Sequence, residues 1–172
     1  SSSAASDVYK RQDVTTAYMD PFREASTLVM IFDIYNPRTG EIYSKDPRQV
    51  AKKAEKYLAS TGIADTAFFA PEAEFYIFDD VRYSVAAGES FYKVDSEEAA
   101  WNTGREEEGG NLANKTPYKG GYFPVSPVDK TADLRDDITL KLIEAGFILE
   151  RSHHEVGTAG QQEINYPVSY TH

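Results

Sequence analysis

The sequence contains no cysteine, so it can form neither a disulfide bond nor a thiolate zinc site. It is also poor in positive charge, with 18 lysine and arginine residues against 28 aspartates and glutamates and a formal net charge of −10. Binding of nucleic acid needs a basic face, which this balance argues against. No apolar run approaches the roughly 20 residues of a membrane span, and the N-terminus lacks the order of a signal peptide. We therefore expect a cytoplasmic domain that attracts cations and binds neither nucleic acid nor membrane.

The composition favours a folded protein, because 41% hydrophobic and 13% aromatic residues can fill a core. A length of 172 residues suffices for one domain or for pieces of two. The two ends do not resemble the rest: residues 7–12 (DVYKRQ) resemble one translation of a transposon-derived sequencing adapter, and residues 168–172 (VSYTH) resemble a translation of its reverse complement. We therefore expect residues 1–12 and 168–172 to be artefactual flanks, and the part between them to be an internal piece of a longer protein.

Two helices are predicted from the residues at their ends. The first begins after Asp46, a favoured N-cap, with Pro47 at the first helical position, and it ends before Gly62. The second spans Thr131 to Ala145 and is closed by Gly146.

Strands are predicted from apolar and β-branched runs. Residues 27–35 (TLVMIFDIY) form a nearly continuous apolar run that predicts a buried strand, and residues 66–81 predict a second long strand in which Pro71 marks a bulge or an edge. A polar, glycine-rich loop is expected at 102–121. A short strand is expected at 147–150, and an antiparallel hairpin joins 153–157 to 161–166. These elements together predict an α+β fold.

Two glutamates of the second strand suggest a cation site. Glu72 and Glu74 are two residues apart, so they project from one face with their Cβ atoms roughly 6.6 Å apart. By spacing alone, this pattern is usually a solvated face. The surrounding apolar residues, however, predict a core strand, in which two ionised carboxylates are costly unless a cation compensates them.

A second acidic group lies in the predicted hairpin, at Glu150, His153, His154, Glu155 and Glu163. If residues 157–160 form the turn, Glu155 and Glu163 could face each other across paired strands. Together with the first pair they would form an all-oxygen site suited to Mg²⁺ or Mn²⁺. The alternative is that both glutamates face solvent. For the two histidines we favour an ordinary surface or core role, because a hard cation does not need imidazole.

Three motifs together resemble bacterial type I glutamine synthetase, in the chain order and at the spacing of that family. They are PEAEFYIFD at 71–79, KGGYFPV at 119–125 and HHEVGTAGQQEINY at 153–166. The resemblance covers residues 13–167. It implies the end of an N-terminal β-grasp domain at 13–45 and the first part of a catalytic domain, with a curved antiparallel sheet, at 46–167.

The resemblance also implies a reaction, namely ATP-dependent ligation of ammonium to glutamate through γ-glutamyl phosphate, with Mg²⁺ or Mn²⁺ ions. The family assembles as a homo-oligomer, a dodecamer of two stacked hexamers. The positions of this chain that match family site residues are Glu74, Glu155 and Glu163 for the metal beside glutamate and ammonium, Glu72 for the ATP-side metal, Glu150 for the nucleotide site, and Tyr122 for the ammonium pocket.

Further ligands of the family's site would lie beyond Tyr166 and before residue 13, so we expect the parent protein to be the enzyme and this fragment to be inactive. Two alternatives remain open. The parent could be a relative that glutamylates another amine, such as putrescine or methylamine. It could also be a non-catalytic module that binds divalent cations.

Overall fold

The computed structural model describes residues 8–103 and 110–170. The chain divides into two compact units. The first unit comprises residues 1–69, 144–146 and 168–172, and the second comprises 70–143 and 147–167. Among the described residues every pairing of strands is antiparallel, and two helices accompany the strands. The α+β prediction agrees with this arrangement.

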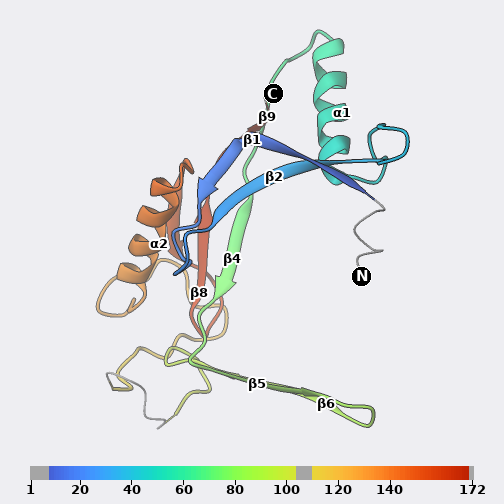
Figure 1. Ribbon diagram of the computed structural model, residues 1–172. Coiled ribbons are helices and arrows are strands. Elements are labelled where there is room, and N and C mark those ends of the chain that lie inside the picture. The colour runs from blue at the N-terminus through green and yellow to red at the C-terminus, as the bar shows by residue number, and fades with distance from the viewer. Residues whose placement is uncertain (1–7, 104–109, 171–172) are drawn as a thin grey trace. The chain divides into compact units, whose positions relative to one another are not determined.

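The first unit contains an antiparallel ribbon, one helix and a short strand pair (Figure 1). Its elements are β1 (Tyr9–Met19), β2 (Leu28–Tyr35), α1 (Pro47–Ser60), β3 (Ala67–Phe69) and β9 (Val168–Tyr170). β1 pairs with β2, and β3 pairs with β9. Residues 9–12 and 168–170, which the sequence sets apart, take part in these pairings.

Helix α1 begins and ends as its end residues predict. The Asp46 side chain accepts a hydrogen bond from the Arg48 backbone N–H at 3.0 Å, and Pro47 is the first helical residue. Gly62 follows the helix with a φ of 70°, a conformation that glycine adopts without strain. The local sequence is therefore sufficient to define this helix.

Strand β2 is present, but the prediction that it is buried is wrong. Leu28 is 58% exposed, and the one buried residue of the strand is Asp33. The physical reason is that β2 pairs in a two-stranded sheet, which can cover little of its own surface. Asp33 instead forms an ion pair with Lys52 of α1, in which the Lys52 ammonium donates to the Asp33 carboxylate at 2.6 Å and so joins the ribbon to the helix.

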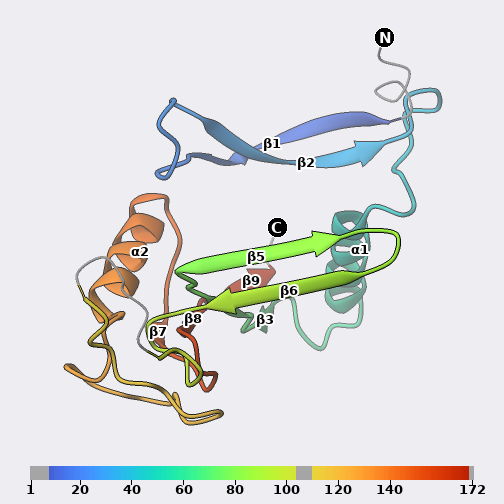
Figure 2. The same ribbon diagram turned by 90° about the horizontal axis from the view of Figure 1, so that it is seen from below.

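The second unit contains a three-stranded sheet, a hairpin and one helix. Its elements are β4 (Glu72–Tyr76), β5 (Asp80–Val85), β6 (Ser90–Asp95), α2 (Ala132–Glu144), β7 (Arg151–His154) and β8 (Gln161–Asn165). The sheet has the order β4-β8-β7, so β8 is central. β5 and β6 form a separate two-stranded hairpin (Figure 2) that the sequence did not lead us to predict.

Two strand predictions need correction. The predicted strand over 66–81 is interrupted at 70–71 and again at 77–79, so β3, β4 and the start of β5 are separate strands with different partners. Proline has no N–H to donate to a neighbouring strand. Residues 147–150 do not form a strand, because the Phe147 N–H donates to the Leu142 carbonyl at 3.0 Å and so closes α2. The hairpin strand begins only at Arg151.

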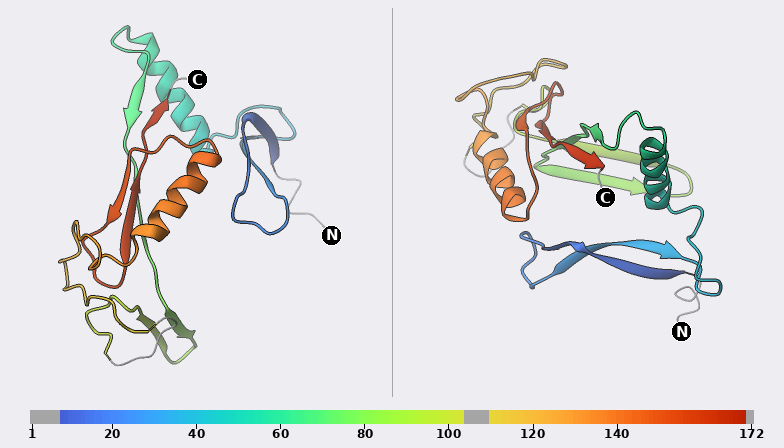
Figure 3. Two further views of the ribbon diagram at one scale, coloured as in Figure 1. Left: turned by 90° about the vertical axis from the view of Figure 1, so that its left-hand side faces the viewer. Right: turned by 90° about the horizontal axis from the view of Figure 1, so that it is seen from above.

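Helix α2 lies along one face of the three-stranded sheet, beside β7 and β8 (Figures 1 and 3). Arg135 donates to the Gln162 side-chain oxygen at 2.6 Å, and Thr139 lies 3.4 Å from the Ser152 hydroxyl. Since side chains alternate along a strand, the neighbouring residues His153 and Glu163 project from the opposite face. The helix therefore covers the face of the sheet opposite to the one that carries His153 and Glu163. Among the described residues no helix is both long and apolar enough to cross a membrane.

Candidate metal centre

Strand register brings two carboxylates and one imidazole into a single row across the sheet. Glu163 of the central strand pairs with Glu74 on one side and with His153 on the other. Directly paired residues project from the same face of a sheet. The row therefore lies on the face away from α2.

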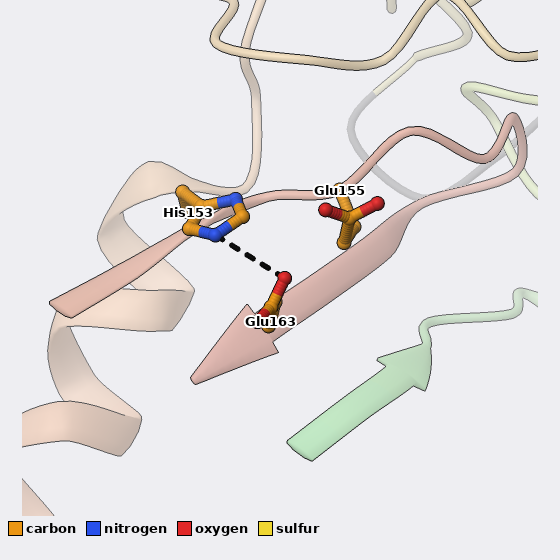
Figure 4. Close-up of side chains that lie close together, drawn as sticks. All are labelled: His153, Glu155 and Glu163. Carbon is orange, nitrogen blue, oxygen red and sulfur yellow. Dashed lines mark ion pairs between the residues drawn. The ribbon is translucent and has the colours of Figure 1, made fainter. Parts of the chain in front are cut away.

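The tightest group consists of His153, Glu155 and Glu163, whose side chains point toward one another (Figure 4). One ligand atom from each residue lies within 4.8 Å of the others. Glu155 and Glu163 are each only 5% exposed, and the His153 Nε2 atom lies 3.3 Å from a Glu163 oxygen. Two buried carboxylates this close are costly unless a positive charge lies between them. Oxygen and imidazole donors in this arrangement fit a divalent cation.

Neighbouring groups hold each of these three candidate metal ligands in place. The His153 Nδ1 atom lies 3.0 Å from the backbone carbonyl oxygen of His154, which can only accept, so Nδ1 carries a proton and Nε2 faces Glu163. Glu163 accepts from the Asn165 amide, and Glu155 accepts from the Val156 backbone N–H. Metal ligands are commonly held by hydrogen bonds of this kind.

The structure places Glu155 and Glu163 close together but not directly opposite each other. His153 occupies the position opposite Glu163, and the Glu155 N–H donates to the Gln161 carbonyl at 2.8 Å. The two glutamates are therefore diagonal neighbours, one step apart on the same face. With residue 155 opposite residue 161, the loop between the strands comprises the five residues 156–160, where the sequence predicted a turn at 157–160.

Glu72 and Glu74 share the acidic face, as their spacing predicts, but the expectation that they lie on a core strand is wrong. β4 is an edge strand of the sheet, and both glutamates are exposed. Glu74 accepts from the Gln161 amide at 2.8 Å and is paired with Glu163, whereas Glu72 is paired with Asn165, one step further from the cluster. The cost of burying like charges therefore applies to Glu155 and Glu163 and not to the β4 pair.

Tyr122 lies beside the same carboxylates. Desolvation, the charge of Glu155 and its hydrogen bonding, and the charges of Glu163 and Glu74 raise the pKa of the Tyr122 hydroxyl. The neighbouring Phe123 ring stacks on Tyr122 at 5.6 Å between centroids and lies 5.5 Å from the His153 ring. The loop that carries both rings therefore lies against the cluster.

Glu150 is not brought to the cluster. It is exposed and lies one residue before β7, where its backbone N–H donates to the Asn165 carbonyl at 2.9 Å. Five residues of extended chain separate it from Glu155, roughly 16 Å at about 3.3 Å per residue. Any role for Glu150 belongs to a separate part of the site.

Sequence reasoning did not single out Glu98, which contacts the other histidine. His154 is 1% exposed, its Nε2 atom lies 2.9 Å from a Glu98 oxygen, and its Nδ1 atom lies 2.8 Å from the Glu155 carbonyl oxygen. Burial alone would lower the pKa of His154, but the Glu98 carboxylate and the Glu155 carbonyl hold that pKa above its ordinary value. No local pattern in the sequence connects residues 98 and 154. For His153, the two-residue spacing to Glu155 placed both side chains on one face and was a usable signal.

The fold and the site together describe an antiparallel-sheet protein with a candidate acidic cation site, and comparison with known proteins assigns the chain to a family. Residues 44–171 match the family model described as glutamine synthetase, catalytic domain. The chain belongs to the glutamine synthetase family, as the sequence resemblance indicated.

Individual relatives agree with this assignment. The chain is 63% identical over 161 residues to the glutamine synthetase of Streptomyces coelicolor, and 54% identical over 164 residues to that of Mycobacterium tuberculosis, with 94% of this chain and 34% of each relative covered. A cryo-electron microscopy structure of Plasmodium falciparum glutamine synthetase superposes with a TM-score of 0.76 at 30% identity, covering 99% of this chain and 33% of that one. The chain thus spans about a third of the length of the relatives it matches.

Proposed function

We propose that the protein to which this chain belongs ligates ammonia to the γ-carboxylate of glutamate at the expense of ATP, through a γ-glutamyl phosphate intermediate. The observation that carries the proposal is the convergence of two buried glutamates, Glu155 and Glu163, with His153 and Tyr122 on the face of the sheet opposite α2. Relatives that are 54–63% identical carry the name glutamine synthetase, which supports it.

The carboxylate oxygens on this face of the sheet fit a hard divalent cation, Mg²⁺ or Mn²⁺. Glu74, Glu155 and Glu163 would hold one ion, and Glu72 would contribute to a second ion that binds with ATP. Glu150 would line the nucleotide site. When bound, such ions supply charge neutralisation and Lewis acidity for phosphoryl transfer.

The chain's own residues have separate tasks in this proposal. The carboxylates supply a negative field that attracts ammonium as well as metal ions. The Tyr122 hydroxyl is protonated near neutral pH, because its ordinary pKa of 10.0 already lies well above 7 and the carboxylates raise that pKa further, so it can donate to Glu155 and adds no negative charge. Tyr122 thereby borders the ammonium pocket and fixes one carboxylate oxygen.

An isotope assay on the full-length protein tests the proposal. Incubation with glutamate, ATP, Mn²⁺ and ¹⁵N-ammonium should yield ¹⁵N-glutamine, detected by mass spectrometry. Glu163→Gln should reduce the rate by at least about 100-fold, since loss of an outer-sphere partner alone costs 10–100-fold. Glu89→Gln, at an exposed hairpin position, is the matched control and should leave it unchanged. Absence of labelled glutamine from the full-length protein would refute the proposal.

Other outcomes of the same assay would support one of the two alternative functions. Preferred use of methylamine or putrescine would make the protein a relative that glutamylates another amine. Mn²⁺ binding without turnover of any amine would make it a non-catalytic cation-binding module. We propose that the 172-residue chain by itself is inactive, and labelled glutamine formed by that chain would contradict this.

We also propose the wider setting that the sequence implies. Residues 13–45 would belong to a β-grasp domain and 46–167 to the catalytic domain, an assignment supported by a family match that begins at residue 44. The full-length protein would assemble in the cytoplasm as two stacked hexamers, which light scattering would detect by its mass. Residues 1–12 and 168–172 would be artefactual, and sequencing of the native gene would replace them.

A further inference from the structure

A buried hydrogen-bonded pair lies directly behind the cluster. His154 follows His153 in β7, so its side chain projects from the opposite face of the sheet. Its Nε2 atom lies 2.9 Å from the Glu98 carboxylate, and both side chains are almost fully buried. Neither residue belongs to the cation cluster.

The second ring nitrogen of His154 contacts the backbone of a cluster residue. Nδ1 lies 2.8 Å from the Glu155 carbonyl oxygen, which can only accept. One imidazole therefore joins the Glu98 carboxylate to the peptide that carries Glu155. Rotation of that peptide would move the Glu155 side chain away from Glu163 and His153.

The loop bearing Tyr122 rests on the same two groups. A Cβ added to Gly121 would lie 2.2 Å from the Glu155 carbonyl oxygen and 3.0 Å from the His154 ring. The Gly121 N–H donates to the Val156 carbonyl at 3.0 Å. This loop therefore packs directly against the His154 ring and the Glu155 peptide.

Glu98 is itself held on both sides. Its backbone carbonyl accepts from the Thr116 N–H at 3.0 Å, and the Ala100 N–H donates to the Thr158 hydroxyl at 2.8 Å. That hydroxyl in turn donates to the Thr116 carbonyl. These hydrogen bonds hold the backbone segment that carries the Glu98 side chain, and the carboxylate of Glu98 contacts His154.

We propose that the His154–Glu98 pair is a positioning element that fixes the Glu155 carboxylate against Tyr122 and so sets the affinity of the cluster for its cation. The catalytic consequence rests on the proposed function, but the effect on geometry and cation binding does not. A buried pair of this kind is weak evidence for stability, because desolvation offsets most of the attraction. The contacts of the His154 ring to the Glu155 carbonyl and to the loop at Gly121 instead indicate that the pair positions these two groups.

Three variants of the full-length protein test the proposal, with Mn²⁺ alone as the probe. Glu98→Ala removes the carboxylate and should weaken Mn²⁺ binding about 10–100-fold, as loss of an outer-sphere partner does. Glu98→Gln keeps an oxygen that accepts from Nε2 and should recover most of that loss. Asp33→Asn disturbs a different ion pair, that of the buried Asp33 with Lys52 in the first unit, and should leave Mn²⁺ affinity unchanged. Electron paramagnetic resonance of free Mn²⁺ measures all three affinities.

A metal-independent measurement accompanies the titration. Hydrogen exchange in residues 117–123 and 155–157 should accelerate at least about tenfold in Glu98→Ala and stay near wild type in Glu98→Gln. The proposal would be overturned if Glu98→Ala kept wild-type Mn²⁺ affinity and wild-type exchange, or if Asp33→Asn lost as much affinity as Glu98→Ala. Failure of the wild type to make glutamine would refute the proposed function, yet the exchange comparison would still decide this inference.

Discussion

Replacement of Gly121 by alanine tests the packing of the Tyr122 loop on the cluster. Gly121 does not need glycine for its φ, which lies outside the left-handed region, so only space opposes a side chain. The added Cβ would lie 2.2 Å from the Glu155 carbonyl oxygen, where ordinary contact begins at 3.4 Å. The clash is with backbone, and no side-chain rotation can relieve it.

The expected loss of stability follows from two terms. Overpacking in a well-packed region costs about 1–3 kcal/mol. Displacement of the loop also breaks the hydrogen bond from the Gly121 N–H to the Val156 carbonyl, for about 0.5–1.5 kcal/mol. Together these destabilise the second unit by about 1.5–4.5 kcal/mol, which lowers a urea midpoint by about 0.8–2.3 M at a slope of about 2 kcal/mol/M.

Fluorescence of Trp101 provides the assay. It is the one tryptophan of the 172-residue chain, its ring stacks on Tyr118 at 6.3 Å, and its indole N–H donates to the Val94 carbonyl. Gly88→Ala is the control, because its added Cβ meets nothing within 4 Å, and it should stay within about 0.5 kcal/mol of wild type. Equal midpoints for Gly121→Ala and Gly88→Ala would refute the reasoning.

Three further predictions follow from individual contacts. Asp46→Ala removes the α1 cap and should cost about 1 kcal/mol in urea unfolding followed by circular dichroism; no change would contradict the capping role. Although burial raises it, the pKa of Asp129 is held below its ordinary 3.8 by Arg135, so this pair stabilises the fold above pH 3.8 and loses its effect as the pH falls through the lower folded value. Urea midpoints of wild type and Asp129→Asn should therefore converge only below pH 3.8, and a constant difference down to pH 2 would argue against it. Glu155→Gln should lower the pKa of Tyr122 toward its ordinary value in an absorbance titration at 295 nm, with Tyr122→Phe identifying that step; an unchanged titration would remove Glu155 as a cause.

Helices were the most predictable elements because their ends are defined by neighbouring residues. Asp46 and Pro47 begin α1, and the expected span from Thr131 to Ala145 differs from α2 by one residue at each end. Strand burial was less predictable. The residues of β2 are apolar enough for a core, but their exposure depends on what lies against the strand, and that is a property of the fold.

In the candidate site, too, some features follow from the local sequence and others depend on the fold. The two-residue spacings of Glu72 with Glu74 and of His153 with Glu155 place each pair on one face, because side chains alternate along any strand. The spacings do not reveal that β4 is an edge strand, nor that His153 and not Glu155 stands opposite Glu163. Pairing register depends on the conformation of the turn and on the neighbouring strands.

By itself, the sequence determined the acidic charge, both helices, the hairpin and the family to which the chain belongs, since composition, end residues and motifs are local properties. Only the tertiary structure decided which carboxylates are buried, which residue faces which across the sheet, and that Glu98 lies behind the Glu155 peptide. Residues 98 and 154 are joined by a contact 56 positions apart along the chain. Contacts of that kind arise when the folded chain buries polar groups and must pair them, and no spacing rule along the sequence records them.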